Sequence, residues 1–187
     1  MTIYPEGQSE ELVAENHPQK PEMGSRSITF SRELWIEETD FAEVPPKGFR
    51  RLTVPADGSP AKPVRLRYGY VIVPTSFEKD AEGRVTVVHA NYLPETKSGT
   101  EGSMSVKTKA TIHWLDAQTA RAAEFRVYDR LFNEPNPEAG EGTFLDHLTP
   151  NSKTILQGYV EPCTADAANE ERFQFERTGY FVADRKD

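Results

Sequence analysis

Residues Val64–Ile72 read Val-Arg-Leu-Arg-Tyr-Gly-Tyr-Val-Ile, and this stretch carries the clearest structural pattern in the chain. Successive side chains of a strand point to opposite faces, so the alternating apolar residues would line one face of an extended strand. Arg65 and Arg67 would then project together from the other face. Two guanidinium groups on a rigid strand suit hydrogen bonding to phosphate or to base edges. The alternative is a solvated strand face whose arginines pair with neighbouring glutamates.

Segments with strand character continue on both sides of this stretch, and most are rich in aromatic and branched residues. We expect strands at Phe30–Glu37, Phe49–Pro55, Val64–Pro74, Met104–Trp114, Glu124–Phe132 and Thr154–Val160, with hairpins over Phe77–Tyr92 and Phe173–Ala183. Only Asp116–Ala123 and Thr143–Leu148 have helical character, and both look like connectors. Several short strands at this spacing predict an all-β fold of barrels or sandwiches.

Composition excludes several classes of protein. The single cysteine, Cys163, excludes an internal disulfide and a cysteine-based zinc cluster, and it fits a reducing, cytoplasmic setting. No run approaches the ~18 apolar residues of a membrane helix, so we expect no membrane partner. The four histidines lack metal-ligand spacing, and the phosphate-loop, dinucleotide and nucleophile-elbow motifs are absent. No residue pattern therefore indicates a metal or a catalytic site.

The charge of the chain is unevenly distributed. A net charge of −8 taken alone argues against nucleic acid, because binding depends largely on neutralising phosphates with Lys and Arg. Between Lys47 and Arg67, however, six of the chain's 22 basic residues stand against one acidic residue, Asp57. A local basic patch on an acidic body can still attract a polyanion.

Several strings of the sequence, in order and along nearly the whole chain, together resemble the C-terminal half of glutaminyl-tRNA synthetases. They are HPQKPEMGSR from His17, FSRELWIEETDF from Phe30, VRLRYGYVI from Val64, TIHW from Thr111, VYDRLF from Val127, and YVEPC and FQFERTGYF near the end. The resemblance implies two β-barrels related to a ribosomal protein that binds ribosomal RNA. A distal barrel, residues 24–112, would be inserted into a proximal barrel formed by residues 1–23 and 113–187. Both would grip the anticodon loop of tRNA-Gln.

The resemblance also implies six anticodon-binding residues, namely Arg50, Arg51, Arg65, Arg67, Gln174 and Arg177. Arg65 and Arg67 correspond to the pair at the first anticodon base, and Arg50 and Arg51 to the basic pair at the third. Gln174 corresponds to a glutamine that hydrogen-bonds the central uracil, whose pairing edge offers a donor and an acceptor to an amide. Arg177 would contact the RNA backbone. The alternative for Gln174 is a polar residue that points outward between two core phenylalanines.

The chain departs from the family pattern in ways that bear on function. The signatures of the catalytic half are absent, so we expect the chain to be inactive alone. ATP and Mg²⁺ would bind a parent catalytic domain in cis. The chain begins after the segment that supplies another arginine to the central base, and Tyr68 stands where the family commonly has asparagine. We expect an excised, monomeric domain.

Two other interpretations stay open. One is the same module from a glutamyl-tRNA synthetase, although the glutamine in FQFER favours the glutamine enzyme. The other is a free-standing ribosomal-RNA-binding barrel protein, although 187 residues exceed the usual length of a single barrel. For a small-molecule enzyme on a β-barrel the sequence offers no motif.

Overall fold

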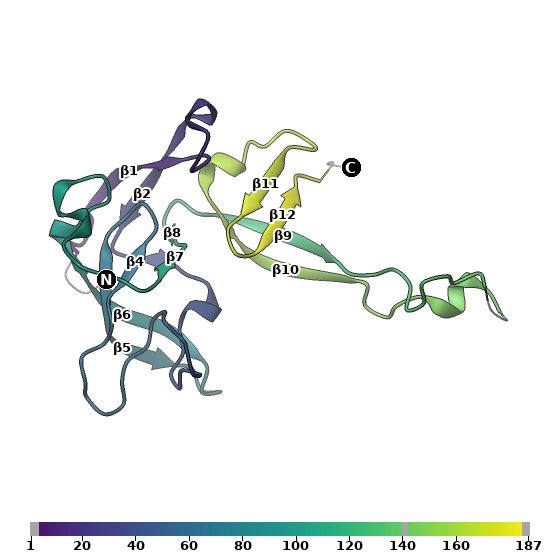
Figure 1. Ribbon diagram of the computed structural model, residues 1–187, viewed down its shortest axis with the longest axis horizontal. Helices are drawn as coiled ribbons and strands as arrows, with labels where there is room; N and C mark the ends of the chain where they lie inside the picture. Colours follow the sequence, from purple (N-terminus) through teal and green to yellow (C-terminus); the bar gives the residue numbers. More distant parts are fainter. Residues whose placement is uncertain (1–3, 140–141, 185–187) are drawn as a thin grey trace. The chain divides into compact units, whose positions relative to one another are not determined.

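The computed structural model describes residues 4–139 and 142–184, and it consists of strands joined by short turns (Figure 1). The strands are β1 (Ser9–Glu15), β2 (Ser25–Ser31), β3 (Leu34–Trp35), β4 (Val64–Leu66), β5 (Val71–Lys79), β6 (Val85–Leu93), β7 (Thr111–Ile112), β8 (Leu115–Asp116), β9 (Arg121–Tyr128), β10 (Lys153–Val160), β11 (Arg172–Phe175) and β12 (Gly179–Val182). Short 3₁₀ helices lie between them: η1 (Pro21–Met23), η2 (Glu38–Asp40), η3 (Pro94–Thr96), η4 (Glu101–Met104), η5 (Phe144–His147) and η6 (Pro162–Thr164). The described residues contain no α-helix, which confirms the all-β prediction, and no helix among them could span a membrane.

The chain divides into two compact units. The first consists of Met1–Ala120 together with Glu161–Asp187, and the second of Arg121–Val160. The chain therefore leaves the first unit at the start of β9 and returns to it directly after β10. The barrel boundaries expected from the family resemblance remain a prediction.

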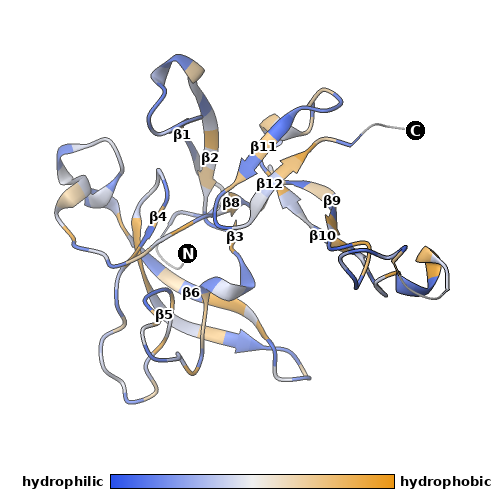
Figure 2. Ribbon diagram, turned by 45° about the vertical axis from the view of Figure 1, so that its right-hand side comes forward, coloured by the Kyte–Doolittle hydropathy of each residue, from blue (hydrophilic) through white to orange (hydrophobic). Residues whose placement is uncertain are grey.

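A four-stranded sheet in the order β6-β5-β4-β7 is the largest sheet among the described residues. Strands β5 and β6 form the expected hairpin around Asp80–Gly83, and Figure 2 shows that the connecting turn is mostly hydrophilic. The Asp80 carboxylate accepts hydrogen bonds from the backbone N–H groups of Glu82 (3.1 Å) and Arg84 (2.8 Å). Gly83 adopts a φ of 81°, a left-handed conformation that glycine reaches without steric cost. These local features explain why the sequence revealed this turn.

The Val64–Pro74 stretch does not form the single strand that its alternation predicts. Strand β4 ends at Leu66, and the chain turns back so that the Leu66 N–H donates to the Tyr70 carbonyl (2.8 Å). Tyr68 occupies the left-handed region with a φ of 58°. The Trp114 indole N–H donates to the Arg67 carbonyl at 2.8 Å, and the Ser98 N–H donates to the Gly69 carbonyl at 2.9 Å. Partners distant in sequence therefore stabilise the turn, and local alternation cannot reveal them.

Four other expected elements differ in the structure. Phe30–Glu37 is not one strand, because β2 ends at Ser31 and β3 covers only Leu34–Trp35. Phe49–Pro55 contains only an isolated bridge from Leu52 to Phe41, and Met104–Trp114 contains only the short strand β7. Asp116–Ala123 is not helical, because Asp116 accepts the N–H (2.9 Å) and hydroxyl (2.8 Å) of Thr119 and fixes a turn before β9. Such side-chain bonds compete with helix formation.

Other predictions of local structure are confirmed. The C-terminal hairpin exists as β11 and β12, and strands β9 and β10 lie where two strands were expected. The helical segment near Thr143 is η5, where the Thr143 and Asp146 side chains form a capping box. Reciprocal bonds of this kind satisfy free backbone donors at a helix start.

An aromatic cluster forms the centre of the first unit's core. Phe30 is fully buried, and its ring lies 4.9–5.3 Å from the rings of Tyr4, Tyr70 and Trp114. The hydroxyls of Tyr4 and Tyr70 both donate to the Glu10 carboxylate, at 3.3 and 2.7 Å. Burial, followed by the charge and hydrogen bond of Glu10, raises the pKa of Tyr4 to about 12. The cluster thus combines aromatic packing with satisfied polar groups at its edge.

The second unit is an antiparallel ribbon of β9 and β10 that pairs Tyr128 with Lys153 and Arg121 with Val160. A bridge between Phe132 and Leu148 continues the pairing. About half of the side-chain surface of Ile155 and other apolar residues of the ribbon is exposed. Isolated two-stranded ribbons are marginally stable in water, so the ribbon gains little from burial within itself.

Within the first unit, a partly buried ion pair attaches the start of the segment Glu161–Asp187 to strand β2. Arg26 in β2 donates through two nitrogens to the Glu161 carboxylate, which also lies 3.7 Å from His113. Burial alone would raise the pKa of Glu161, but hydrogen bonds and charge from Arg26 and His113 outweigh it and lower the pKa to about 2. Arg26 also donates to the Glu15 carbonyl at 3.0 Å.

We expect this ion pair to contribute to acid sensitivity. A carboxyl whose pKa falls from 4.5 in the unfolded chain to about 2 stabilises the fold above pH 4.5, and the contribution disappears as the pH falls toward 2. The shift corresponds to on the order of 3 kcal/mol. Glu161→Gln should lower stability at neutral pH and flatten its dependence between pH 4.5 and 2, as measured by urea unfolding. The exposed Glu95→Gln control should keep the wild-type curve, and equal curves for Glu161→Gln and wild type would contradict the assignment.

Candidate nucleic-acid interface

The six predicted RNA-binding residues come from three separate places in the first unit. Arg50 and Arg51 precede the bridge at Leu52, and Arg65 lies in β4 with Arg67 in the following turn. The last two, Gln174 and Arg177, belong to the β11–β12 hairpin (Figure 1). Arg51 and Arg177 share one carboxylate, and Arg67 pairs with Glu176, the residue before Arg177. These ion pairs form a network that is connected through the chain at Glu176–Arg177.

Asp40 lies at the centre of this network. Its side chain is fully buried, and its two oxygens accept bonds from Arg177 at 2.7 and 2.9 Å and from Arg51 at 3.0 Å. A guanidinium that donates two parallel bonds to one carboxylate is a strong and directional contact. The hydrogen bonds that Arg177 donates to Asp40 raise the pKa of Arg177 further, so its charge is permanent. Glu37 lies 3.5 Å from the same guanidinium.

The backbone around Asp40 explains how the carboxylate is held in place. Asp40 ends η2, and its carbonyl accepts the Leu52 N–H at 2.9 Å, directly after Arg51. The Arg51 guanidinium lies over the Phe49 ring, 5.4 Å from its centroid. The backbone hydrogen bond between Leu52 and Asp40 therefore places the Arg51 guanidinium next to the Asp40 carboxylate.

Arg177 reaches Asp40 from a strained backbone position. It adopts a φ of 63° in the turn between β11 and β12, where the Thr178 N–H donates to the Phe175 carbonyl at 3.0 Å. A left-handed conformation is uncommon for a residue with a Cβ and persists when surrounding contacts determine it. The bond to Asp40 is such a contact.

Arg67 is held by Glu176, the residue that precedes Arg177 in the β11–β12 hairpin. Its guanidinium pairs with Glu176 at 2.7 Å and lies over the Tyr68 ring, 5.2 Å from the centroid. The Tyr68 hydroxyl donates to the Glu15 carbonyl at 3.2 Å. Arg67 thus connects the turn after β4 to the C-terminal hairpin.

Arg65 binds different partners from Arg67, and the expectation that the two side chains share a strand face stays a prediction. Its guanidinium donates to the Thr96 carbonyl at 3.1 Å, to the Ser98 hydroxyl at 3.4 Å and to the Ser103 carbonyl. Burial lowers its pKa. Arg65 therefore connects η3 to η4, whereas Arg67 pairs with Glu176 of the C-terminal hairpin.

Arg50 and Gln174 are exposed, and neither forms a side-chain hydrogen bond within the described ranges. Phe173 and Phe175 flank Gln174, and their rings are stacked at 6.2 Å on the half-buried side of the hairpin. Alternation along β11 therefore points the Gln174 amide outward. Its donors and acceptor are available to a ligand.

The acidic residues of the network are ion-pair partners that sequence reasoning missed. Asp40, Glu37 and Glu176 are three of 30 acidic residues, and nothing in their local pattern distinguishes them. Only the tertiary fold brings Asp40 and Arg177 together across 137 positions. The EETDF and FQFER strings contain these residues, so the resemblance marked the regions without revealing the pairing.

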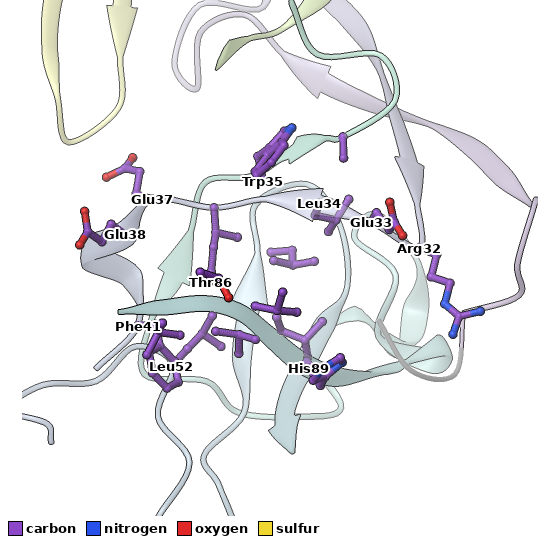
Figure 3. Close-up of a pocket in the computed structure, with 18 of the residues that line it drawn as sticks. Arg32, Glu33, Leu34, Trp35, Glu37, Glu38, Phe41, Leu52, Thr86 and His89 are labelled. Atoms are coloured by element: carbon purple, nitrogen blue, oxygen red, sulfur yellow. The ribbon is translucent and has the colours of Figure 1, made fainter. Parts of the chain in front are cut away.

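A separate apolar cavity of about 1080 Å³ lies in the first unit, between residues 32–38 and β6 (Figure 3). Leu34, Trp35 and Leu52 contribute to its lining, and none of the six predicted RNA-binding residues does. Within the described residues no group of His, Cys, Asp or Glu side chains is arranged to hold a metal ion.

Comparisons with known proteins identify the family of the chain. Two family models with the same description, tRNA synthetases class I (E and Q), anti-codon binding domain, match residues 1–93 and 111–184. The two matches together cover most of the chain and place it in a class of anticodon-binding domains. The chain is a member of the anticodon-binding domain family of class I tRNA synthetases for glutamate and glutamine.

Individual relatives are similar over nearly the whole chain. The glutamine–tRNA ligase of Cupriavidus metallidurans is 61% identical over 184 residues, which are 98% of this chain and 31% of the relative. The glutamine–tRNA ligases of Cupriavidus necator and Nitrosomonas europaea are 59% and 47% identical, again over 98% of this chain and over 30% and 32% of their own lengths. The chain spans about a third of the length of these relatives.

The two arginines of the VRLR string should respond differently to truncation. Arg65→Ala should lower the free energy of unfolding by about 1–3 kcal/mol, because the Thr96 and Ser103 carbonyls lose their donor. Arg67→Ala breaks a partly exposed pair and should cost less than about 1 kcal/mol. Urea unfolding of both variants tests this difference, and equal losses would mean that Arg65 does not stabilise the η3–η4 segment.

Proposed function

We propose that this chain binds the anticodon loop of tRNA-Gln as part of a glutamine–tRNA ligase. The observation that carries the proposal is the Asp40-centred network, which gathers cationic side chains from distant segments beside the hairpin that presents Gln174. The gathered positions are among those to which the family resemblance assigns contacts with the anticodon loop. The names of the relatives favour the glutamine enzyme over the glutamate enzyme.

Different residues serve different parts of the anticodon in this proposal. Gln174 pairs with the central uracil, and Arg177 contacts the RNA backbone close by. Arg50 and Arg51 serve the third base, whereas Arg67 contacts the first base. Arg65 belongs to the same first-base pocket and also holds the η3–η4 segment in place.

We also propose how the chain belongs to a longer glutamine–tRNA ligase. Residues 24–112 form the distal barrel, and residues 1–23 with 113–187 form the proximal barrel. A catalytic domain in cis uses ATP and Mg²⁺ to join glutamine to the tRNA. The parent enzyme is a cytoplasmic monomer, and the 187-residue chain binds RNA without catalysing amino-acid activation.

Binding of anticodon stem–loop RNAs to the 187-residue chain tests the function. The wild-type chain should prefer uracil over the other three bases at the central position. Gln174→Ala should reduce that preference by about 1–3 kcal/mol of binding free energy, because a mismatched base no longer leaves a buried amide unpaired. The dependence of affinity on salt should not change, since a neutral amide neutralises no phosphate.

The matched control is Gln157→Ala, which removes an exposed strand glutamine from β10. It should keep the full preference for uracil. Equal losses across the four bases for Gln174→Ala would show that Gln174 does not read the base. Absence of anticodon-dependent binding by the wild-type chain would refute the proposed function itself.

A further inference from the structure

The arginines of the candidate interface are held by two kinds of carboxylate. Glu37 and Glu176, which lie next to Arg177 and Arg67, keep 37% and 40% of their side-chain surface exposed. Asp40, which contacts Arg51 and Arg177, keeps none. An exposed carboxylate can rotate into solvent and leave its arginine to a ligand. A fully buried carboxylate cannot do so without leaving its charge unpaired.

We propose that Asp40 is a positioning residue, which fixes Arg51 and Arg177 in the orientations that contact RNA. This inference rests on the proposed function and extends it to a residue that does not itself touch RNA. The role of Asp40 is to hold two cations from distant segments at one point.

The contacts of the two arginines leave part of each available. Arg51 uses one terminal nitrogen for Asp40 and is 35% exposed. Arg177 uses both terminal nitrogens for Asp40 and is also 35% exposed. Each guanidinium is thus fixed along one edge and partly open to solvent. The rotamer freedom of these long side chains is lost on folding and not on RNA binding, which favours affinity.

Asp40 also connects two segments that are proposed to contact the anticodon loop, the β11–β12 hairpin and the segment with Arg50 and Arg51. Arg177 belongs to the hairpin that carries Gln174, whereas Arg51 follows Arg50 in a segment more than a hundred residues earlier. Without the Asp40 charge the two partly exposed guanidinium groups would repel each other, with no carboxylate between them. We therefore expect both the hairpin and the Arg50–Arg51 segment to lose their relative positions.

A simple count of charges predicts the opposite of this proposal. Replacing an aspartate by asparagine removes one negative charge, which should strengthen the attraction of any polyanion. If Asp40 positions the arginines, Asp40→Asn should instead weaken binding of the RNA. The direction of the change therefore separates positioning from bulk electrostatics.

The experiment measures affinity of the 187-residue chain for the anticodon stem–loop RNA at several salt concentrations, together with the melting temperature. Asp40→Asn should bind at least tenfold more weakly than wild type and should discriminate less between bases at the third position. Glu43→Gln is the matched control, because it removes the same charge from an exposed ion pair with Lys79. It should bind as tightly as wild type or slightly more tightly.

A double-mutant cycle distinguishes positioning from a merely structural role. In a chain that already carries Arg51→Ala and Arg177→Ala, adding Asp40→Asn should change affinity less than twofold. Persistence of the tenfold loss in that background would overturn the proposal. Wild-type or tighter affinity of the Asp40→Asn single variant would also overturn it.

Arg177→Lys keeps the test valid if Asp40→Asn does not fold. Lysine keeps the charge but cannot donate in parallel to both carboxylate oxygens, so a folded variant should also bind at least fivefold more weakly with reduced discrimination. Wild-type behaviour of Arg177→Lys would refute the positioning role. If the wild-type chain shows no anticodon-dependent binding, both proposals fail, whereas normal wild-type binding with an unaffected Asp40→Asn variant refutes the positioning role alone.

Discussion

Two arginine–carboxylate contacts determine how residues 161–184 join the fold. Arg26 and Glu161 are 135 positions apart, and Asp40 and Arg177 are 137 apart, yet each pair is joined by two hydrogen bonds. The segment between these anchors returns after β10 and carries the hairpin with Gln174. A further ion pair, Glu176 with Arg67, connects the same hairpin to the turn after β4. The candidate interface therefore exists because the two ends of the chain are held together by charge.

An acidic protein can bind a polyanion in this arrangement because some of its basic residues are held in ion pairs and others are exposed. Within the network, three arginines face three carboxylates, so the cluster has little net charge. The long-range attraction of phosphates must then come from exposed residues such as Lys47, Arg50 and Lys62. The paired arginines provide hydrogen-bond donors with fixed orientations, and the exposed basic residues provide the electrostatic attraction of phosphates. A count of charges over the whole chain mixes these tasks.

The sequence predicted those features that depend on neighbouring residues. The β5–β6 and β11–β12 hairpins, strands β9 and β10 and the capped η5 segment all have local signals, namely turn residues, alternation and a capping box. The turn at Arg67–Gly69 had no such signal, because Trp114 and Ser98 hold it from a distance. The family resemblance indicated the six candidate site residues, but the acid that gathers Arg51 and Arg177 could be found only from the folded chain.

The left-handed backbone of Arg177 has a consequence for how this protein could change over time. Glycine would occupy that φ of 63° without strain, so relaxation of the turn and retention of the guanidinium are competing demands at one position. Glycine would, however, remove two of the hydrogen bonds to the fully buried Asp40 carboxylate, so the fold itself also favours arginine. Position 177 is therefore a site of trade-off, where the residue present records which demand has been the stronger.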